Sequence, residues 1–279
     1  MTAYFERVAA DRYRPTTHAG GAWNDAEIHF SPLGGLLVHA IDLHRAESAA
    51  SAPASASAPT SAAPDKQLGR ISFDILGFLA ADECTVQVQT VRPGRTIELV
   101  EASVSIGGRT AATARAWFIS PVDTASVAGG EPEPLPAPHP LRSWPIHETW
   151  SGGYVASLDV RPVTPPRPGR TTAWLGSGLQ LVAGEQASPH ASFIALVDTA
   201  NGIAVRQTPG SWLFPNLDLT IHLYRQPTGA WVGLDTTVTF GPLGLGLTSS
   251  VLHDVAGPVG RAEQVLTVRP APTLPPQGR

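Results

Sequence analysis

A run of prolines near the middle of the chain constrains its fold more than any other feature. Between Gly129 and Pro145, prolines recur at positions 132, 134, 136, 138, 140 and 145. Because proline fixes φ at about −65° and has no backbone N–H, this stretch is predicted to be an extended linker and not a helix or a central strand. The linker divides the 279 residues into two halves of similar size, and each half is long enough to form a domain.

Two other segments are poorly suited to a packed core. Residues 46–64 are almost entirely alanine, serine and proline, a composition that indicates a flexible insert because it offers little apolar side chain to bury. The last ten residues, 270–279, are expected to form a disordered tail. We therefore predict a first domain over 1–120 that contains the insert, a linker over 121–149, and a second domain over 150–269.

Both halves show the same order of predicted elements. The first half has a helix over 36–43, preceded by Gly34-Gly35, and then β-rich runs at 70–78, 85–91, 96–106 and 110–119. The second half has a helix over 191–199, preceded by Ser188-Pro189, and then runs at 217–224, 231–240, 246–253 and 262–268. These runs are rich in β-branched residues and are bounded by turns. The shared order predicts a duplicated unit of one helix and one sheet, which is an α+β fold.

Composition and charge exclude several classes of function. The chain has 19 basic and 23 acidic residues and a formal net charge of −4, whereas nucleic-acid binders usually carry a basic face. The sequence has no apolar run near the roughly 20 residues that span a bilayer, and its charged first residues do not resemble a signal peptide. We therefore expect a cytoplasmic protein with neither a nucleic acid nor a membrane as partner.

The sequence also lacks several catalytic and metal-binding motifs. Cys84 is its only cysteine, which excludes a disulfide framework and a cysteine-based zinc site. The nine histidines are scattered without ligand spacing, so neither a metal nor a cofactor is expected. It contains no Gly-x-Ser-x-Gly elbow, dinucleotide fingerprint or phosphate-binding loop.

Three polar residues stand within otherwise apolar β-runs of the second half. Asp218 lies between two leucines, Thr239 follows Val238, and Gln264 precedes Val265. A carboxylate among leucines is costly to bury unless it has partners or a task, and on adjacent strands the three side chains could converge on one water molecule. The alternative is a turn or capping aspartate beside an ordinary strand threonine and glutamine.

In its second half the chain resembles the type II (TesB-like) acyl-CoA thioesterases. The resemblance rests on the Leu217-Asp218 strand that ends in Tyr224-Arg225, on Trp231 and Thr239 in the next strand, and on Gln264 in the last. In the first half, residues 33–40 resemble the opening of the family's first central helix, and residues 92–95 resemble one of its strand turns. The resemblance covers most of residues 20–120 and 150–268.

This resemblance implies a double hotdog, in which two antiparallel sheets, each wrapped around a central helix, join into one pseudo-dimeric sheet. It implies that Asp218, Thr239 and Gln264 activate a water that hydrolyses an acyl-CoA. Asp218 would accept or orient the proton, and amides near Gly34 and Gly35 would bind the substrate carbonyl; a tight turn or helix packing explains these glycines equally well.

The first half is expected to lack a second site, because Asp74, at the position equivalent to Asp218, is expected to pair with Arg95. Further copies of the chain are possible partners. Two other functions remain open. One is a non-catalytic acyl-binding hotdog protein, and the other is a thioesterase that acts on acyl chains bound to a carrier protein. A hotdog hydratase is disfavoured, because its Asp-x-Asn-Pro-x-His motif is not present.

Overall fold

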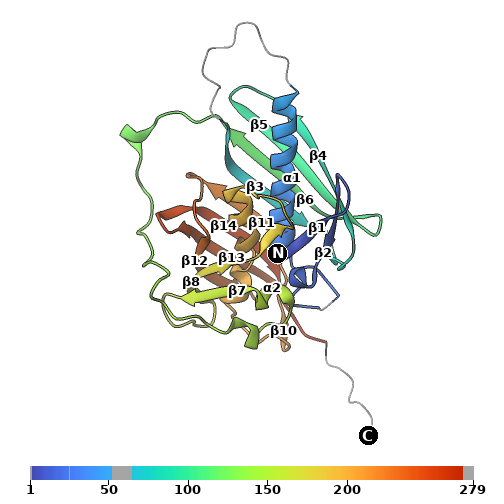
Figure 1. Ribbon diagram of the computed structural model, residues 1–279. Helices are drawn as coiled ribbons and strands as arrows, with labels where there is room; N and C mark the ends of the chain where they lie inside the picture. The colour runs from blue at the N-terminus through green and yellow to red at the C-terminus, as the bar shows by residue number, and fades with distance from the viewer. Residues whose placement is uncertain (1, 25, 52–64, 273–279) are drawn as a thin grey trace.

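The structure is a computed structural model that describes residues 2–24, 26–51 and 65–272 (Figure 1). The first half contains the helices and strands up to β6: β1 (Ala3–Arg7), β2 (Arg12–Pro15), η1 (Thr17–Ala19), α1 (Phe30–Ala50), β3 (Gln67–Ile75), β4 (Cys84–Arg92), β5 (Ile97–Ile106) and β6 (Arg109–Ile119). The linker carries two short 3-10 turns, η2 (Ala125–Val127) and η3 (Ile146–Glu148).

The second half begins with a single turn of helix and ends in a strand pair. Its elements are α2 (Gly153–Ala156), β7 (Leu158–Pro162), β8 (Arg170–Ser177), β9 (Gln180–Val182), α3 (Pro189–Val197), α4 (Ala200–Ile203), β10 (Trp212–Leu213), β11 (Asp218–Leu223), β12 (Trp231–Phe240), β13 (Leu245–Asp254), β14 (Gly257–Thr267) and β15 (Arg269–Pro270). Within the described residues no helix is both long and apolar enough to cross a membrane.

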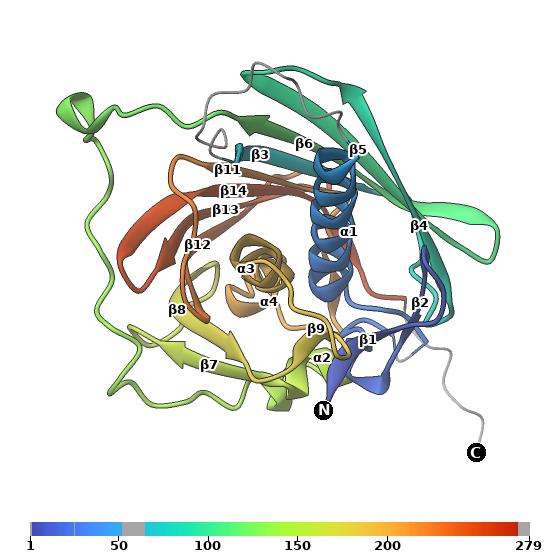
Figure 2. The ribbon, with the colours of Figure 1, turned by 45° about the horizontal axis from the view of Figure 1, so that its top comes forward.

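One large sheet contains strands from both halves. In the described residues it has thirteen strands in the order β7-β8-β12-β13-β14-β11-β3-β6-β5-β4-β2-β1-β9. The halves meet where β11 pairs antiparallel with β3, and the sheet curls around α1 and α3, which lie side by side on its inner face (Figure 2). A sheet wrapped around a central helix, twice over in one chain, confirms the predicted double hotdog.

Local sequence explains the hairpins of this sheet. Apolar side chains alternate with polar ones along the strands, so that one face packs on the helices and the other meets solvent. The β5–β6 turn uses Gly107 and Gly108 at φ 56° and 77°, which suits the twist of a tight hairpin and excludes most other residues.

The two central helices touch at a glycine. An added Cβ on Gly35 would lie 2.5 Å from the Cβ of Ala195 on α3 and 3.1 Å from the carbonyl oxygen of Ala191. Glycine at this point of α1 therefore lets the two helix backbones approach closely. The first twelve residues of α1 are all buried, as expected of a helix enclosed by protein on every side.

Buried polar contacts also join the halves across α1. His39 Nε2 lies 2.8 Å from Glu185 Oε2, and Arg7 Nε donates to the same carboxylate at 2.6 Å. The hydrogen bond from Arg7 lowers the pKa of Glu185 to about 2, so this carboxylate is charged near neutral pH. Asp42, one turn further along α1, accepts hydrogen bonds from Ser188 and meets His190.

The structure tests part of what was predicted for the low-complexity segments. The predicted linker has neither helix nor strand between 128 and 145, although η2 and η3 lie within its predicted bounds, and its Pro136 carbonyl accepts a hydrogen bond from Trp174. The predicted insert begins too early, because α1 continues to Ala50; residues 52–64 lie outside the described residues. In the predicted tail, Pro270 belongs to β15, and residues 273–279 lie outside the described residues.

Candidate active site

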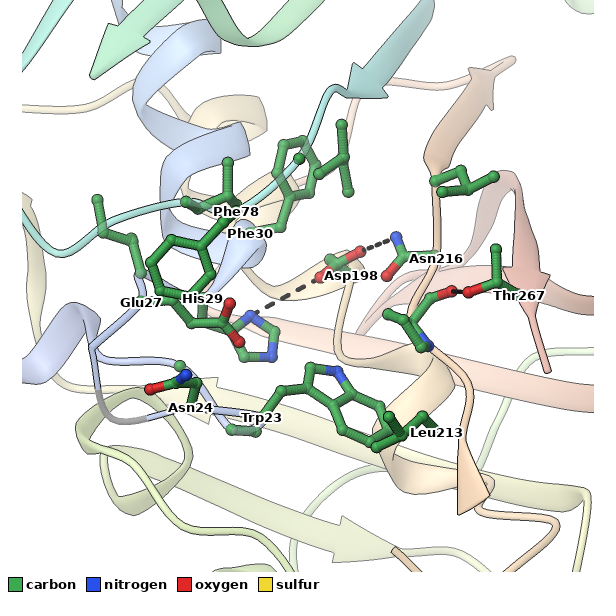
Figure 3. A pocket seen from close by; sticks show the side chains of 18 of the residues that line it. Trp23, Asn24, Glu27, His29, Phe30, Phe78, Asp198, Leu213, Asn216 and Thr267 are labelled. Carbon is green, nitrogen blue, oxygen red and sulfur yellow. Dashed lines mark hydrogen bonds and ion pairs between the residues drawn. The ribbon is translucent and has the colours of Figure 1, made fainter. Parts of the chain in front are cut away.

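A buried aspartate at the end of α3 is the centre of the candidate site. Asp198 caps the C-terminus of this helix and is 6% exposed. Its Oδ1 accepts two hydrogen bonds, from Asn216 Nδ2 at 2.7 Å and from Gln264 Nε2 at 2.8 Å. Because both donors bind Oδ1, the other oxygen, Oδ2, faces the side of His29 (Figure 3).

Burial sets the protonation of this carboxyl. Loss of hydration raises the pKa of Asp198 to about 6, although the hydrogen bonds from Asn216 and Gln264 act in the opposite direction. The negative end of the α3 dipole also disfavours a charge at this position. The group is therefore mostly ionised near neutral pH, yet it accepts a proton far more readily than an exposed aspartate.

His29 lies beside Asp198 and belongs to the other half of the chain. It precedes α1, where its Nδ1 accepts a hydrogen bond from Ser31 N at 3.1 Å and lies 3.7 Å from Asp198 Oδ2. Burial lowers the pKa of His29 to about 3, so the ring is neutral near pH 7. With Nδ1 as the acceptor, the proton is assigned to Nε2, which has no hydrogen-bond partner among the described residues.

A buried tyrosine packs against His29. The Tyr154 ring packs on the His29 ring with centroids 4.2 Å apart and planes at 30°. Its hydroxyl lies 2.6 Å from Thr199 Oγ1, next to Asp198 in the chain. Burial raises the pKa of Tyr154 well above its ordinary value, so this group holds the site in place as a neutral hydroxyl.

An apolar cavity of about 630 Å³ opens onto this cluster, a volume typical of ligand sites. Asp198, His29 and Asn216 are among its polar lining residues, together with Glu27, and Trp23 and Phe78 also line it (Figure 3). The other large apolar side chains that line it are Ile28, Phe30, Ile75, Leu76, Leu79, Leu213 and Leu217. Helix α1 begins at Phe30 on the cavity wall, so its positive end faces the space beside Asp198.

The three residues predicted from the sequence do not meet. Asp218 points to the outer face of the sheet, where its Oδ1 accepts the amide of Val265 at 2.6 Å. Thr239 is exposed on the same face, and β13 and β14 separate their strands, a distance of about 14 Å at the usual strand spacing. The expected convergence fails because both side chains alternate away from the helices.

Gln264 points to the inner face and reaches the candidate site, where its partner is Asp198 and not Asp218 or Thr239. Gly34 and Gly35 lie inside α1, one turn beyond its first residue, and neither lines the cavity. Their environment supports the packing alternative, because an added Cβ on Gly34 would touch Phe30 and one on Gly35 would collide with α3. Asp74 accepts a hydrogen bond from Thr113 Oγ1 at 3.3 Å and makes no ion pair with Arg95 within the described part of the chain.

Sequence reasoning missed Asp198, Asn216 and His29. A signal for Asp198 was present, because an acidic residue directly after the apolar run Phe193–Val197 stands at the helix end where negative charge is unfavourable. Asn216 lies just before β11, and its Nδ2 also donates a hydrogen bond to the carbonyl of Asp218, two residues further along the chain. Only the packing of α1 against the second half brings His29 to this point.

The fold and the site together define a class, the double hotdog with a carboxylate buried between its halves. Solved structures share this architecture over nearly the whole chain. The hot dog fold protein of Alicyclobacillus acidocaldarius has a TM-score of 0.68 at 12% identity, covering 96% of both chains. The acyl-CoA thioesterase II TesB2 of Mycobacterium marinum has a TM-score of 0.62 at 16% identity, also covering 96% of both.

A third structure, the tesB protein of Mycobacterium avium subsp. paratuberculosis, has a TM-score of 0.66 at 16% identity and covers 96% of this chain and 97% of its own. Residues 20–119 match the acyl-CoA thioesterase N-terminal domain, and residues 129–268 match the acyl-CoA thioesterase C-terminal domain. The chain therefore belongs to the acyl-CoA thioesterase family and is a thioester hydrolase. A search of curated proteins finds no match.

Proposed function

We propose that this chain hydrolyses acyl-CoA thioesters with a water activated by Asp198. The observation that carries the proposal is the two-amide arrangement on Asp198, in which Asn216 and Gln264 occupy Oδ1. That arrangement leaves Oδ2, on the side of His29, as an acceptor for a water proton. A pKa of about 6 suits a general base that works near neutral pH.

The reaction conserves atoms and charge in two steps. In the first, the water oxygen bonds to the thioester carbonyl carbon, one water proton passes to Asp198 Oδ2, and the carbonyl π electrons move to oxygen as an oxyanion. In the second, the oxyanion reforms the carbonyl and expels the thiolate, and Asp198 returns the proton to sulfur. The products are a carboxylic acid and the free thiol of CoA.

Two features of the first half support stabilisation of the oxyanion. The neutral His29 ring offers Nε2–H as a hydrogen-bond donor, and it does so without itself gaining or losing charge. The N-terminus of α1 at Phe30 adds a positive dipole end at the same wall of the cavity. Donors of this kind, fixed before the reaction, typically contribute about 10²–10³ in kcat.

The apolar lining supports the cavity as the acyl site. Phe78 and Leu76 line the cavity and are 56% and 54% exposed, which is costly for apolar side chains that meet only water. An acyl chain laid against them would remove that apolar surface from solvent.

The test is release of free thiol from acyl-CoAs of increasing chain length, measured for four proteins side by side. We expect turnover by the wild type and by Asp218→Asn, and a loss of at least about a hundredfold in kcat for Asp198→Asn with the fold intact. Thr239→Val should also keep its activity.

Activity that survives in Asp198→Asn but disappears in Asp218→Asn would overturn the assignment of the base. If no acyl-CoA is turned over, the same proteins are tested with acyl chains on a carrier protein. Turnover there would replace CoA as the substrate, and none in either assay would favour the non-catalytic acyl-binding protein.

A further inference from the structure

A second, much smaller cavity lies beside the acyl cavity. Its volume is about 30 Å³, which exceeds the roughly 10–15 Å³ that one water molecule needs. Five residues line both cavities: Ala22, Trp23, His29, Asp198 and Asn216. The two cavities therefore meet at Asp198, the base of the proposed hydrolysis.

Asn201 brings an unpaired acceptor to the small cavity. It lies on α4, three residues after Asp198, and it lines the small cavity but not the acyl cavity. Its Nδ2 donates to the carbonyl oxygen of Phe214 at 2.9 Å, which fixes the orientation of the amide, because a carbonyl accepts only from the amide nitrogen.

The other end of this amide has no partner. Asn201 is only 5% exposed, and its Oδ1 is buried without a hydrogen bond among the described residues. A buried carbonyl oxygen that accepts no hydrogen bond costs free energy, so such atoms in folded proteins normally pair with a bound molecule when no protein donor is near.

Protein donors on the wall of the small cavity do not fill this need. The indole N–H of Trp150 donates to a backbone carbonyl at 2.9 Å, and both hydrogens of Asn216 Nδ2 are used in other hydrogen bonds. The Thr199 hydroxyl pairs with another hydroxyl at 2.6 Å. The His29 ring makes no hydrogen bond to Asn201. The missing donor is therefore a molecule small enough for the cavity.

We infer that the small cavity holds the water that attacks the thioester, and that Asn201 positions this water together with Asp198. The inference rests on the proposed function and adds a binding site for the second reactant. Asp198 Oδ2 and Asn201 Oδ1 both lack a donor among the described residues, and a water molecule has two hydrogens to donate. With both hydrogens held, its lone pairs are left for the thioester carbon.

The two acceptors have different roles in the first step of hydrolysis. As the water oxygen bonds to the carbonyl carbon, one hydrogen passes as a proton to Asp198 Oδ2, and the carbonyl π electrons move to oxygen. The other hydrogen stays on the attacking oxygen and remains donated to Asn201 Oδ1. Because an amide is a much weaker base than a carboxylate, Asn201 orients the water without competing for its proton.

The remaining walls of the small cavity are apolar. Ile146, Trp150 and Val155 line it and are all buried, so they separate it from bulk solvent. The acyl chain and the water thus reach Asp198 from two different cavities. A change in the small cavity should therefore affect turnover and leave acyl binding intact.

The first test is thiol release from acyl-CoA by wild type and Asn201→Ala over a range of pH. We expect kcat to fall at least about tenfold, because the water is no longer oriented, while KM stays within about twofold of wild type. The inflection near pH 6 should not move, because Asn201 makes no contact that sets the pKa of Asp198. A merely structural role of Asn201 would not separate these three quantities.

Thr171→Val is the matched control. Thr171 also has a buried side-chain oxygen without a partner in the described part of the chain, but it lines neither cavity. Its replacement should leave kcat unchanged. Thermal unfolding shows whether each variant is folded.

The second test does not depend on a variant or on turnover. A high-resolution crystal structure of wild type should show an ordered water about 2.6–3.2 Å from both Asp198 Oδ2 and Asn201 Oδ1. No water within that distance of Asn201 Oδ1 would overturn the inference, whatever the activity.

The kinetic results separate this inference from the proposed function. If Asp198→Asn is inactive but Asn201→Ala has the kcat of wild type, the water site is wrong and the base is right. An unchanged kcat with a raised KM in Asn201→Ala would also overturn the inference. An ordered water in a protein that hydrolyses no thioester would overturn the proposed function and, with it, the reactive role of this water.

Discussion

Replacement of Asp198 by asparagine should make the protein more stable as it makes it inactive. Asparagine fits the hydrogen bonds of the site, because its Oδ1 can accept from both Asn216 and Gln264 as the carboxylate does. Its Nδ2 would then lie where Oδ2 lies, 3.7 Å from the acceptor His29 Nδ1. The variant therefore loses the charge and keeps the neighbours satisfied.

The size of the effect follows from the pKa. The pKa of Asp198 rises from its ordinary value of 3.8 to about 6 in the folded protein. The folded state therefore holds this proton more tightly than the unfolded state does. Ionisation of Asp198 in the folded protein therefore reduces stability as pH rises between these two values. At about 1.36 kcal/mol per pH unit, this reduction is about 1 kcal/mol at pH 4.5 and about 3 kcal/mol at pH 8.

The assay is urea unfolding of wild type and Asp198→Asn at both pH values, with the free energy of unfolding taken from the midpoint and slope. The advantage of the variant should grow by about 2 kcal/mol from pH 4.5 to pH 8. Asp198→Ala is the contrast, since it removes the acceptor of the side-chain hydrogen bonds from Asn216 and Gln264, at a cost of about 1 kcal/mol for each bond lost. An advantage that does not change with pH would refute the reasoning, because Asp198 would then not be a buried acid with a raised pKa.

Three other predictions concern the site and the helix crossing. First, kcat/KM of wild type should rise with pH and level off above an inflection near 6, the pKa of Asp198, since the ionised form is the base; a flat profile between pH 5 and 7 would contradict this. Second, Asn216→Ala removes one of the hydrogen bonds that lower the pKa of Asp198, so it should move that inflection to higher pH, and a loss of activity with the inflection in place would contradict the assigned role. Third, Gly35→Ala should reduce stability by about 1–3 kcal/mol through overpacking, because its Cβ would lie 2.5 Å from Ala195. The control Gly34→Ala, whose Cβ would lie 3.4 Å from Phe30, should unfold near the wild-type melting temperature. Equal melting temperatures of the two variants would show that the helix crossing adjusts.

Much of the fold could be predicted from the sequence because it depends on local patterns. Proline positions locate the linker, alternation of apolar residues locates the strands, and the repeated order of elements predicts the duplication. The predicted helix over 36–43 was too short, since α1 extends from Phe30 to Ala50. Alanine-rich residues before the prolines continue a helix once its first turns are enclosed, because alanine has the highest helix propensity.

The site could be predicted only in part, because its residues are gathered by packing. Gln264 lies at the site beside Asp198, whereas Asp218, which was chosen for its leucine neighbours, faces outward beside Asp74. Because successive side chains of a strand point to opposite faces, Asp218 and Leu219 are predicted to lie on opposite faces of the sheet. The pattern does not indicate which of the two faces meets the helix.

The sequence by itself therefore determined the class of fold, the duplication and the types of residue available for chemistry, since these follow from local propensity and pattern. Tertiary structure alone decided that an acid at the end of α3, an asparagine before β11 and a histidine before α1 would meet at one cavity. The physical reason is that burial raises the pKa of Asp198 and aligns its donors only after both halves have closed around the two helices. Contacts between residues about 170 positions apart, such as His29 and Asp198, exist only in the folded chain.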